Sequence, residues 1–102
     1  MTLSHQWRFP RVKFVSENGA LQQARHVLSE ANEVRKEIGG YFTDSEGEVI
    51  YKIADWGRVD EEMADLLHSV ETYFRIRQEF NLDIAAIFSK VETKNRERGY
   101  YD

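Results

Sequence analysis

Apolar residues recur every three to four positions along two long stretches of the chain, which is the spacing of a helix that buries one face. The first stretch carries Leu21, Ala24, Val27, Leu28, Ala31, Val34 and Ile38 on one arc. The second stretch carries Met63, Leu66, Leu67, Val70, Tyr73 and Phe74. The two patterns predict two amphipathic helices that pack through these arcs.

Residues that favour helix ends set the expected bounds. The first helix is expected to open near Ser16, with Glu17 in its first turn. It is expected to stop at the Gly39-Gly40 pair, because glycine is favoured just past a helix end. The second helix is expected to run from near Val59 to about Phe80.

A third helix is predicted after a break at Asn81, with Asp83 as its N-cap and Gly99 at its end. Between the first two helices, residues 39–58 form a connector rich in turn-favouring residues, and the apolar residues within it fit either a short strand or a helical turn: Val49, Ile50, Tyr51 and Ile53. Residues 1–15 form an aromatic and basic N-terminal arm. The expected fold is one all-α domain over residues 1–102 with about three main helices.

Composition supports one small domain and narrows its surroundings. The chain has 102 residues, of which 41% are hydrophobic and 31% charged, and its net charge is −4. No run approaches the roughly 18 apolar residues of a membrane span, and the N-terminus has no apolar signal-peptide core, so we expect a cytoplasmic protein without a membrane partner. The negative charge argues against nucleic acid as a partner. A chain this short buries a limited core, which favours a homo-oligomer.

Acidic residues line the edges of both apolar arcs. Glu30 and Glu33 stand beside the first arc, and Glu62 and Asp65 stand beside the second, together with Ser69. Residues three apart on a helix have Cβ atoms about 5–6 Å apart, so each couple forms a carboxylate pair, and the two pairs face each other when the arcs pack. Two like charges at that distance repel by about 3 kcal/mol at an effective dielectric constant of about 20, so a positive group is expected between them.

Nearby basic side chains supply only part of that charge. Lys36 lies within reach of Glu33, and Arg58 within reach of Glu62, whereas the other two carboxylates have no Lys or Arg three or four positions away. Magnesium prefers hard oxygen ligands and is commonly completed by substrate phosphates, so Mg²⁺ is the expected cofactor. The absence of cysteine excludes thiolate ligands.

Other interpretations of these residues stay open at this point. Acidic residues beside an apolar stripe are also typical of a solvated helix face, and Glu37 is interpreted as such a surface residue. Asp65-Leu-Leu-His68 resembles half of the Glu-x-x-His arrangement of di-iron bundles, which need two such motifs, so His68 is expected at a helix contact or at the surface. His26, four residues before Glu30, either touches the acidic cluster or is a plain helix-face histidine.

The acidic residues fall into a recognisable pattern. Glu30-Ala-Asn-Glu33, 28 intervening residues and Glu62-Met-Ala-Asp65 resemble the EExxE and ExxD signature of the MazG-like all-α nucleoside triphosphate pyrophosphohydrolases. The stretch DLLHSVETYFRIRQE and the ending VETKNRERGYY are similar to the smaller phage and prophage members, so the resemblance covers roughly residues 21 to 101. The chain departs from the pattern at Ser29, which replaces the first glutamate and removes a possible ligand or water-activating carboxylate.

The resemblance implies a magnesium-dependent hydrolase acting on acid anhydrides, with a four-helix-type acidic cleft in a homodimer or homotetramer. It implies that the four acids of the signature are both the catalytic residues and the metal ligands: Glu30, Glu33, Glu62 and Asp65. It also implies that a basic C-terminal segment binds the substrate through Lys94, Asn95 and Arg98. Cations near a helix C-terminus are favoured by the helix dipole as well, so these residues have a purely structural explanation beside the functional one.

The expected function is therefore the cleavage of a nucleoside triphosphate to pyrophosphate and a nucleoside monophosphate, in the service of nucleotide-pool cleansing. The main alternative is a non-catalytic helical module of the same fold that binds a nucleotide or a protein. A third possibility is a structural α-helical oligomer with solvated acids. The sequence leaves the base and the sugar of the substrate open.

Overall fold

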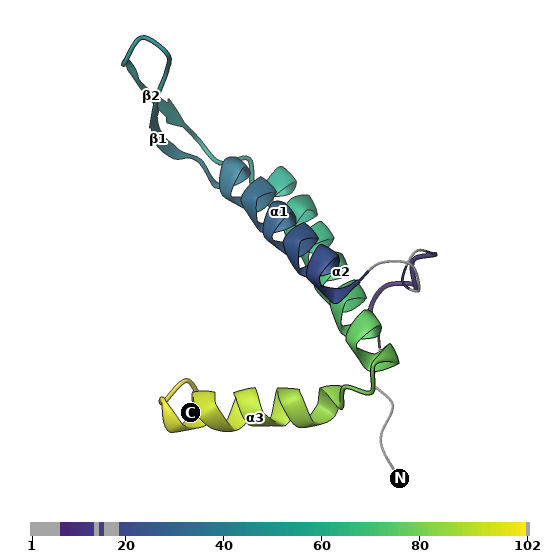
Figure 1. Cartoon of the computed structure of the whole chain (residues 1–102). Helices are drawn as coiled ribbons and strands as arrows, with labels where there is room; N and C mark the ends of the chain where they lie inside the picture. The colour runs from purple at the N-terminus through teal and green to yellow at the C-terminus, as the bar shows by residue number, and fades with distance from the viewer. Residues whose placement is uncertain (1–6, 14, 16–18, 102) are drawn as a thin grey trace.

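Two long antiparallel helices form the body of the molecule, and the computed structural model describes residues 7–13, 15 and 19–101. In chain order the elements are α1 (Ala20–Ile38), β1 (Gly40–Thr43), β2 (Val49–Lys52), α2 (Trp56–Glu79) and α3 (Ile84–Glu97). Helices α1 and α2 lie side by side, the two strands extend beyond one end of this pair, and α3 projects from the other end (Figure 1). The three expected helices are confirmed.

The connector between α1 and α2 contains an antiparallel β-hairpin, which decides between the two conformations that the sequence left open. Gly40 pairs with Lys52 and Thr43 with Val49. The turn is held by Asp44, whose Oδ1 accepts hydrogen bonds from the backbone N–H groups of Glu46 and Glu48, both at 2.9 Å. Gly47 adopts a φ of 82°, which a residue with a side chain rarely adopts.

Most helix ends lie where the sequence predicts them. Helix α1 ends at Ile38, and Gly39 follows with a φ of 92°. Asn81 has a φ of 68° and separates α2 from α3, and Asp83 caps α3 by accepting a hydrogen bond from the N–H of Ala86 at 3.1 Å. Gly99, with a φ of 80°, follows the end of α3.

The start of α2 differs from the prediction. Helix α2 begins at Trp56, one turn earlier than Val59, because the carboxylate of Asp55 accepts hydrogen bonds from the N–H groups of Gly57 and Arg58. Helix α1 begins at Ala20, after Gly19 in an extended conformation. The proposed start near Ser16 and Glu17 lies outside the described residues.

The N-terminal arm is fastened to the second half of α2. Glu71 accepts hydrogen bonds from the backbone N–H groups of Arg8 and Phe9, at 2.8 and 2.9 Å, and Arg75 donates to the carbonyl of Phe9 at 2.6 Å. Arg11 forms an ion pair of 2.7 Å with Glu79. These contacts fix the backbone of the arm along the helix, and they involve residues separated by more than sixty positions in the sequence.

The core of a single chain is small. Its fully buried residues include Val15 and Ile76, whereas many of the residues of the predicted apolar arcs are exposed, among them Leu21, Leu28, Ile38, Met63 and Leu67. Of the described parts of α3, only the start is buried, at Ile84. The radius of gyration is 17.7 Å, against about 13 Å for a compact domain of about 100 residues. None of the described helices combines the length and the hydropathy that a membrane crossing requires.

We predict that Ile76→Ala lowers the free energy of unfolding by about 2–5 kcal/mol, because Ile76 has 0% of its surface exposed and its truncation leaves a cavity. The matched control is Ile53→Ala, since Ile53 is 79% exposed. Urea denaturation of both variants measures the difference. Equal losses in the two variants would show that the packing described for α2 is incorrect.

Candidate metal centre

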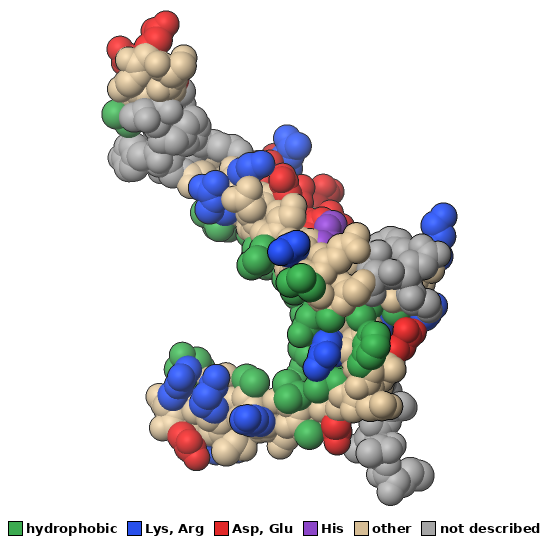
Figure 2. Space-filling model, in the orientation of Figure 1, with side chains coloured by type: hydrophobic (Ala, Val, Ile, Leu, Met, Phe, Trp, Pro, Cys, Tyr) green, Lys and Arg blue, Asp and Glu red, His purple; other side chains and the backbone are tan. Residues whose placement is uncertain are grey.

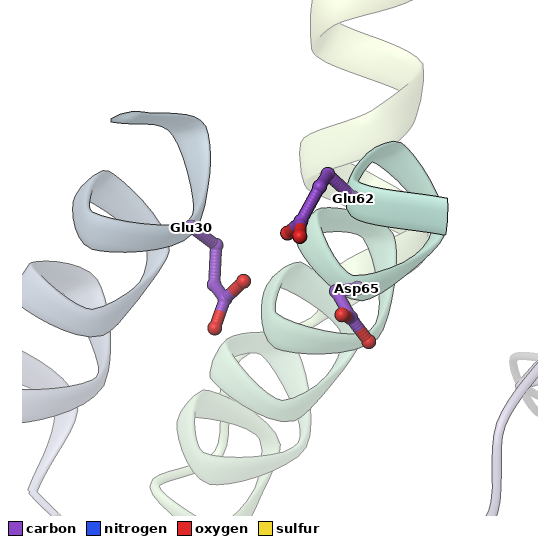
Figure 3. Close-up of side chains that lie close together, drawn as sticks. All are labelled: Glu30, Glu62 and Asp65. Carbon is purple, nitrogen blue, oxygen red and sulfur yellow. The ribbon is translucent and has the colours of Figure 1, made fainter. Parts of the chain in front are cut away.

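Three carboxylates meet at the contact between α1 and α2. Glu30 comes from the middle of α1, while Glu62 and Asp65 come from successive turns of α2. One carboxylate oxygen from each lies within 4.8 Å of the other two. Figure 3 shows the side chains of Glu30 and Glu62 reaching toward each other across the space between the helices. The structure thus brings together three of the four acids that the sequence singles out.

Glu33 lies beside this group and belongs to a different local contact. Its carboxylate accepts a hydrogen bond from Lys36 Nζ at 3.3 Å, as the spacing in the sequence suggests. Its charge nevertheless acts on the cluster, because it contributes to the raised pKa of Glu62. Glu33 therefore stays a candidate at the edge of the site.

Glu37 is not the plain surface residue that the sequence suggests. Its side chain is only 19% exposed, and its carboxylate lies 4.0 Å from Nε of Arg58. Arg58 is the side chain that the sequence places near Glu62. The structure pairs it with Glu37 because α1 and α2 run side by side at this end, and contact across helices is not visible in spacing along one helix.

The charge of the cluster is concentrated enough to disturb ionisation. The pKa of Glu62 is raised above its ordinary value of about 4.5, first because the carboxylate is desolvated and then because the charges of Asp65, Glu33, Glu30 and Glu37 surround it. Both causes disfavour the ionised form. A divalent cation bound among these oxygens would reverse the effect, since it would stabilise the ionised carboxylates.

The residues fit a hard divalent cation. Carboxylate oxygens are the ligands that Mg²⁺ prefers, and Mg²⁺ is usually bound by one or two protein carboxylates together with waters and phosphates. Asp65 is exposed, so the cluster opens to solvent on one side. Glu30, Glu62 and Asp65 would hold the ion, and the open side would leave room for a substrate.

A polar pocket of about 240 Å³ adjoins the cluster, and sequence reasoning did not find it as a site. Glu30 and Asp65 form one part of its lining, and the rest consists of Val12, Gln23, His26, His68, Ser69 and Thr72. His26 Nε2 lies 3.3 Å from Glu30 Oε1, so His26 does touch the acidic cluster. The sequence contains only a weak signal for this pocket. It places Ser69 beside the acidic residues of the second arc, and it does not indicate that Gln23 is buried.

The basic residues expected to bind the substrate lie elsewhere in the chain. Lys94, Asn95 and Arg98 lie at the far end of α3, which projects away from the pair formed by α1 and α2 (Figure 1). Figure 2 shows basic side chains gathered on α3 and acidic ones near the middle of the long helices. Among the described elements, no extensive contact joins α3 to α1, and within one chain the basic residues lie away from the acidic cluster.

Comparison of the chain with protein-family models, with curated proteins and with solved structures finds no match. The candidate site is accordingly defined by its own geometry: three carboxylates from two helices, one of them with a raised pKa, beside a polar pocket.

We predict that Glu62→Gln makes the metal-free protein more stable at pH 7. The folded-state pKa of Glu62 is raised, so the ionised carboxylate destabilises the fold above that pKa, and the amide removes this cost. The gain should shrink as the pH falls through the pKa of Glu62 and vanish below about 4.5, where the carboxyl is protonated in both folded and unfolded chains. Urea denaturation in EDTA across this pH range measures it.

Glu97→Gln is the control, because Glu97 is an exposed acid at the end of α3. Its effect should be small and should not follow the same pH dependence. A Glu62→Gln variant that is no more stable than the parent at pH 7 would contradict the crowding of charge described for this cluster.

Proposed function

We propose that this protein is a magnesium-dependent nucleoside triphosphate pyrophosphohydrolase that releases pyrophosphate and a nucleoside monophosphate. The observation that carries the proposal is the convergence of Glu30, Glu62 and Asp65 from two helices to within 4.8 Å, on a side of the molecule open to solvent. This is the donor set that a magnesium ion and a triphosphate require. The arrangement of these carboxylates agrees with the resemblance of the acidic signature to the MazG-like enzymes. We propose that the biological role of the activity is nucleotide-pool cleansing.

In this proposal the residues of the chain have distinct tasks. Glu30, Glu62 and Asp65 would hold Mg²⁺, which when bound supplies a nucleophile by acidifying water and neutralises charge on the phosphoryl oxygens. Glu33 adds negative charge at the edge of the site while paired with Lys36. His26, 3.3 Å from Glu30, orients that carboxylate. Glu37 of α1 and Arg58 of α2 form an ion pair of 4.0 Å between the two helices beside the site.

The basic residues enter the proposal through a second copy of the chain. Lys94, Asn95 and Arg98 would stabilise the leaving pyrophosphate, and α3 carries them away from the acidic cluster of its own chain. A mostly apolar hollow between α2 and α3 supports such an assembly, and it is lined by Phe74, Ile87, Phe88, Val91 and Tyr101 together with Glu92. In a homodimer or homotetramer, α3 of one copy covers the helices of another, and four long helices enclose the acidic cleft.

The alternative is a non-catalytic helical module that binds a nucleotide or a protein. The observation in its favour is Ser29, which lies one residue before Glu30 and supplies no carboxylate where the resembling signature has one. Such a module would bind Mg²⁺ and nucleotide and release no pyrophosphate. Measurement of both binding and release on the same sample separates the two functions.

We predict that Glu30→Gln, Glu62→Gln and Asp65→Asn each lower the rate of magnesium-dependent pyrophosphate release by at least about tenfold, or about 1.4 kcal/mol of transition-state stabilisation. The same variants should lose the rise in melting temperature that Mg²⁺ causes in the parent. Glu97→Gln should keep both properties. The metal assignment fails if Glu62→Gln keeps the parental rate and the parental stabilisation by Mg²⁺.

We also predict that Lys94 acts on the site of a neighbouring copy. Lys94→Ala and Glu62→Gln should each be nearly inactive alone, and a mixture refolded together should recover about a quarter of the parental activity, because half of the dimers are mixed and one of their two sites is intact. Light scattering should show a species larger than the 12.0 kDa chain. Activity no higher in the mixture than in the separate variants would place Lys94 outside the partner's site.

A further inference from the structure

The pocket beside the acidic cluster has a composition that the proposed chemistry does not require. Three of the polar residues that line it are more than nine-tenths buried: Gln23 is 2% exposed, Thr72 4% and Ser69 6%. They lie on the facing sides of α1 and α2, where packing alone favours apolar side chains. Burying such groups is costly unless they find hydrogen-bond partners.

These buried groups are only partly satisfied by one another. Gln23 Nε2 donates to the carbonyl and the hydroxyl of Ser69, at 3.0 and 3.2 Å, and the hydroxyl of Thr72 donates to the carbonyl of His68 at 3.1 Å. The hydroxyl oxygens of Ser69 and Thr72 keep acceptor capacity, since a hydroxyl has one donor and two acceptor sites. The pocket therefore presents fixed hydrogen-bonding groups.

His68 supplies the group that points most directly to a ligand. It lines the pocket, and its Nε2 is buried without a hydrogen-bond partner among the described residues. Leaving such an atom unpaired is costly, because it loses its hydrogen bonds to water without gaining others. One face of the imidazole is stacked on the ring of Phe9, with ring centroids 4.6 Å apart and an angle of 19° between the planes.

The N-terminal arm supports the imidazole of His68 through the ring of Phe9. The backbone N–H of Phe9 donates a hydrogen bond to Glu71, and its carbonyl accepts one from Arg75. The residue whose ring supports His68 is therefore bound to α2 through both of its backbone polar groups. Val12 of the same arm closes part of the pocket. A segment far away in the sequence thus supports an imidazole that lines the same pocket as Glu30 and Asp65.

The charge of the pocket restricts what it can bind. The described residues that line it include no lysine and no arginine, and two of them are carboxylates, so a bare phosphate would be repelled. A neutral, polar group with hydrogen-bond donors and acceptors fits. We propose that the pocket binds the base of the nucleotide, with His68, Ser69, Thr72 and Gln23 reading its polar edge while the phosphates extend toward Glu30 and Asp65. The identity of the ligand as a nucleotide rests on the proposed function.

The test uses nucleosides, which carry no phosphate, so that it is independent of magnesium and of turnover. Deoxyadenosine, deoxycytidine, deoxyguanosine and deoxyuridine are titrated separately into the full chain in EDTA, and the ¹⁵N resonance of His68 Nε2 is followed by NMR. At least one nucleoside should shift that resonance in a saturable manner. Thr72→Val, which keeps the shape and removes the hydroxyl, should weaken the binding of that nucleoside about fivefold.

Ser69→Ala is the second variant, in case Thr72→Val does not fold, and Ser89→Ala on the exposed face of α3 is the matched control that should bind like the parent. The proposal is overturned if none of the four nucleosides shifts His68, or if the folded pocket variants bind as tightly as the control. Nucleoside binding without pyrophosphate release would support the base-binding pocket and contradict the proposed hydrolase activity. If Thr72→Val releases pyrophosphate with an unchanged base preference, the result would support the hydrolase activity and contradict the base-binding pocket.

Discussion

The contact between α1 and α2 is the interaction on which the rest of the structure depends. Val34 of α1 and Val59 of α2 are buried where the two helices run side by side, and burial of an aliphatic side chain contributes about 1.5–3 kcal/mol. The same contact forces Glu30, Glu62 and Asp65 to within 4.8 Å of one another. Hydrophobic packing therefore creates the concentration of negative charge, and the raised pKa of Glu62 is its electrostatic consequence. A cation relieves the repulsion without disturbing the packing.

The polar groups between the helices follow one another in order along the helix axes. Next to the hairpin, Arg58 faces Glu37. The carboxylate cluster comes next, and the pocket that contains His68 and Gln23 follows, farther from the hairpin. In the proposed function this order matches the order of a nucleotide, with the phosphates at the cluster and the base in the pocket. The arm then completes the pocket from outside, since Phe9 supports His68.

Among the described residues, much of the apolar arcs and most of the basic helix α3 are exposed, and these two features have a common explanation in a second copy. Leu21 and Leu28 on α1 are more than 60% exposed, and α3 stands away from the long helices (Figure 1). Exposed apolar surface of this kind is typical of an interaction site. A partner that covers it would also carry Lys94 and its neighbours toward the carboxylates. Stability and catalysis would then depend on the same assembly.

The sequence by itself determined the helices, because local signals specify them. The 3.6-residue periodicity located α1 and α2, and residues that favour helix ends located α3, with a break at Asn81 and a cap at Asp83, both of which the structure confirms. The sequence also selected the acids of the candidate site, since residues three apart on a helix are always neighbours. Only the tertiary structure decided the contacts between segments that are distant in the sequence. It chose a hairpin for residues 40–52, joined Arg58 to Glu37 and placed the arm against His68, because such contacts depend on how distant parts of the chain pack, and no periodicity along one helix records them.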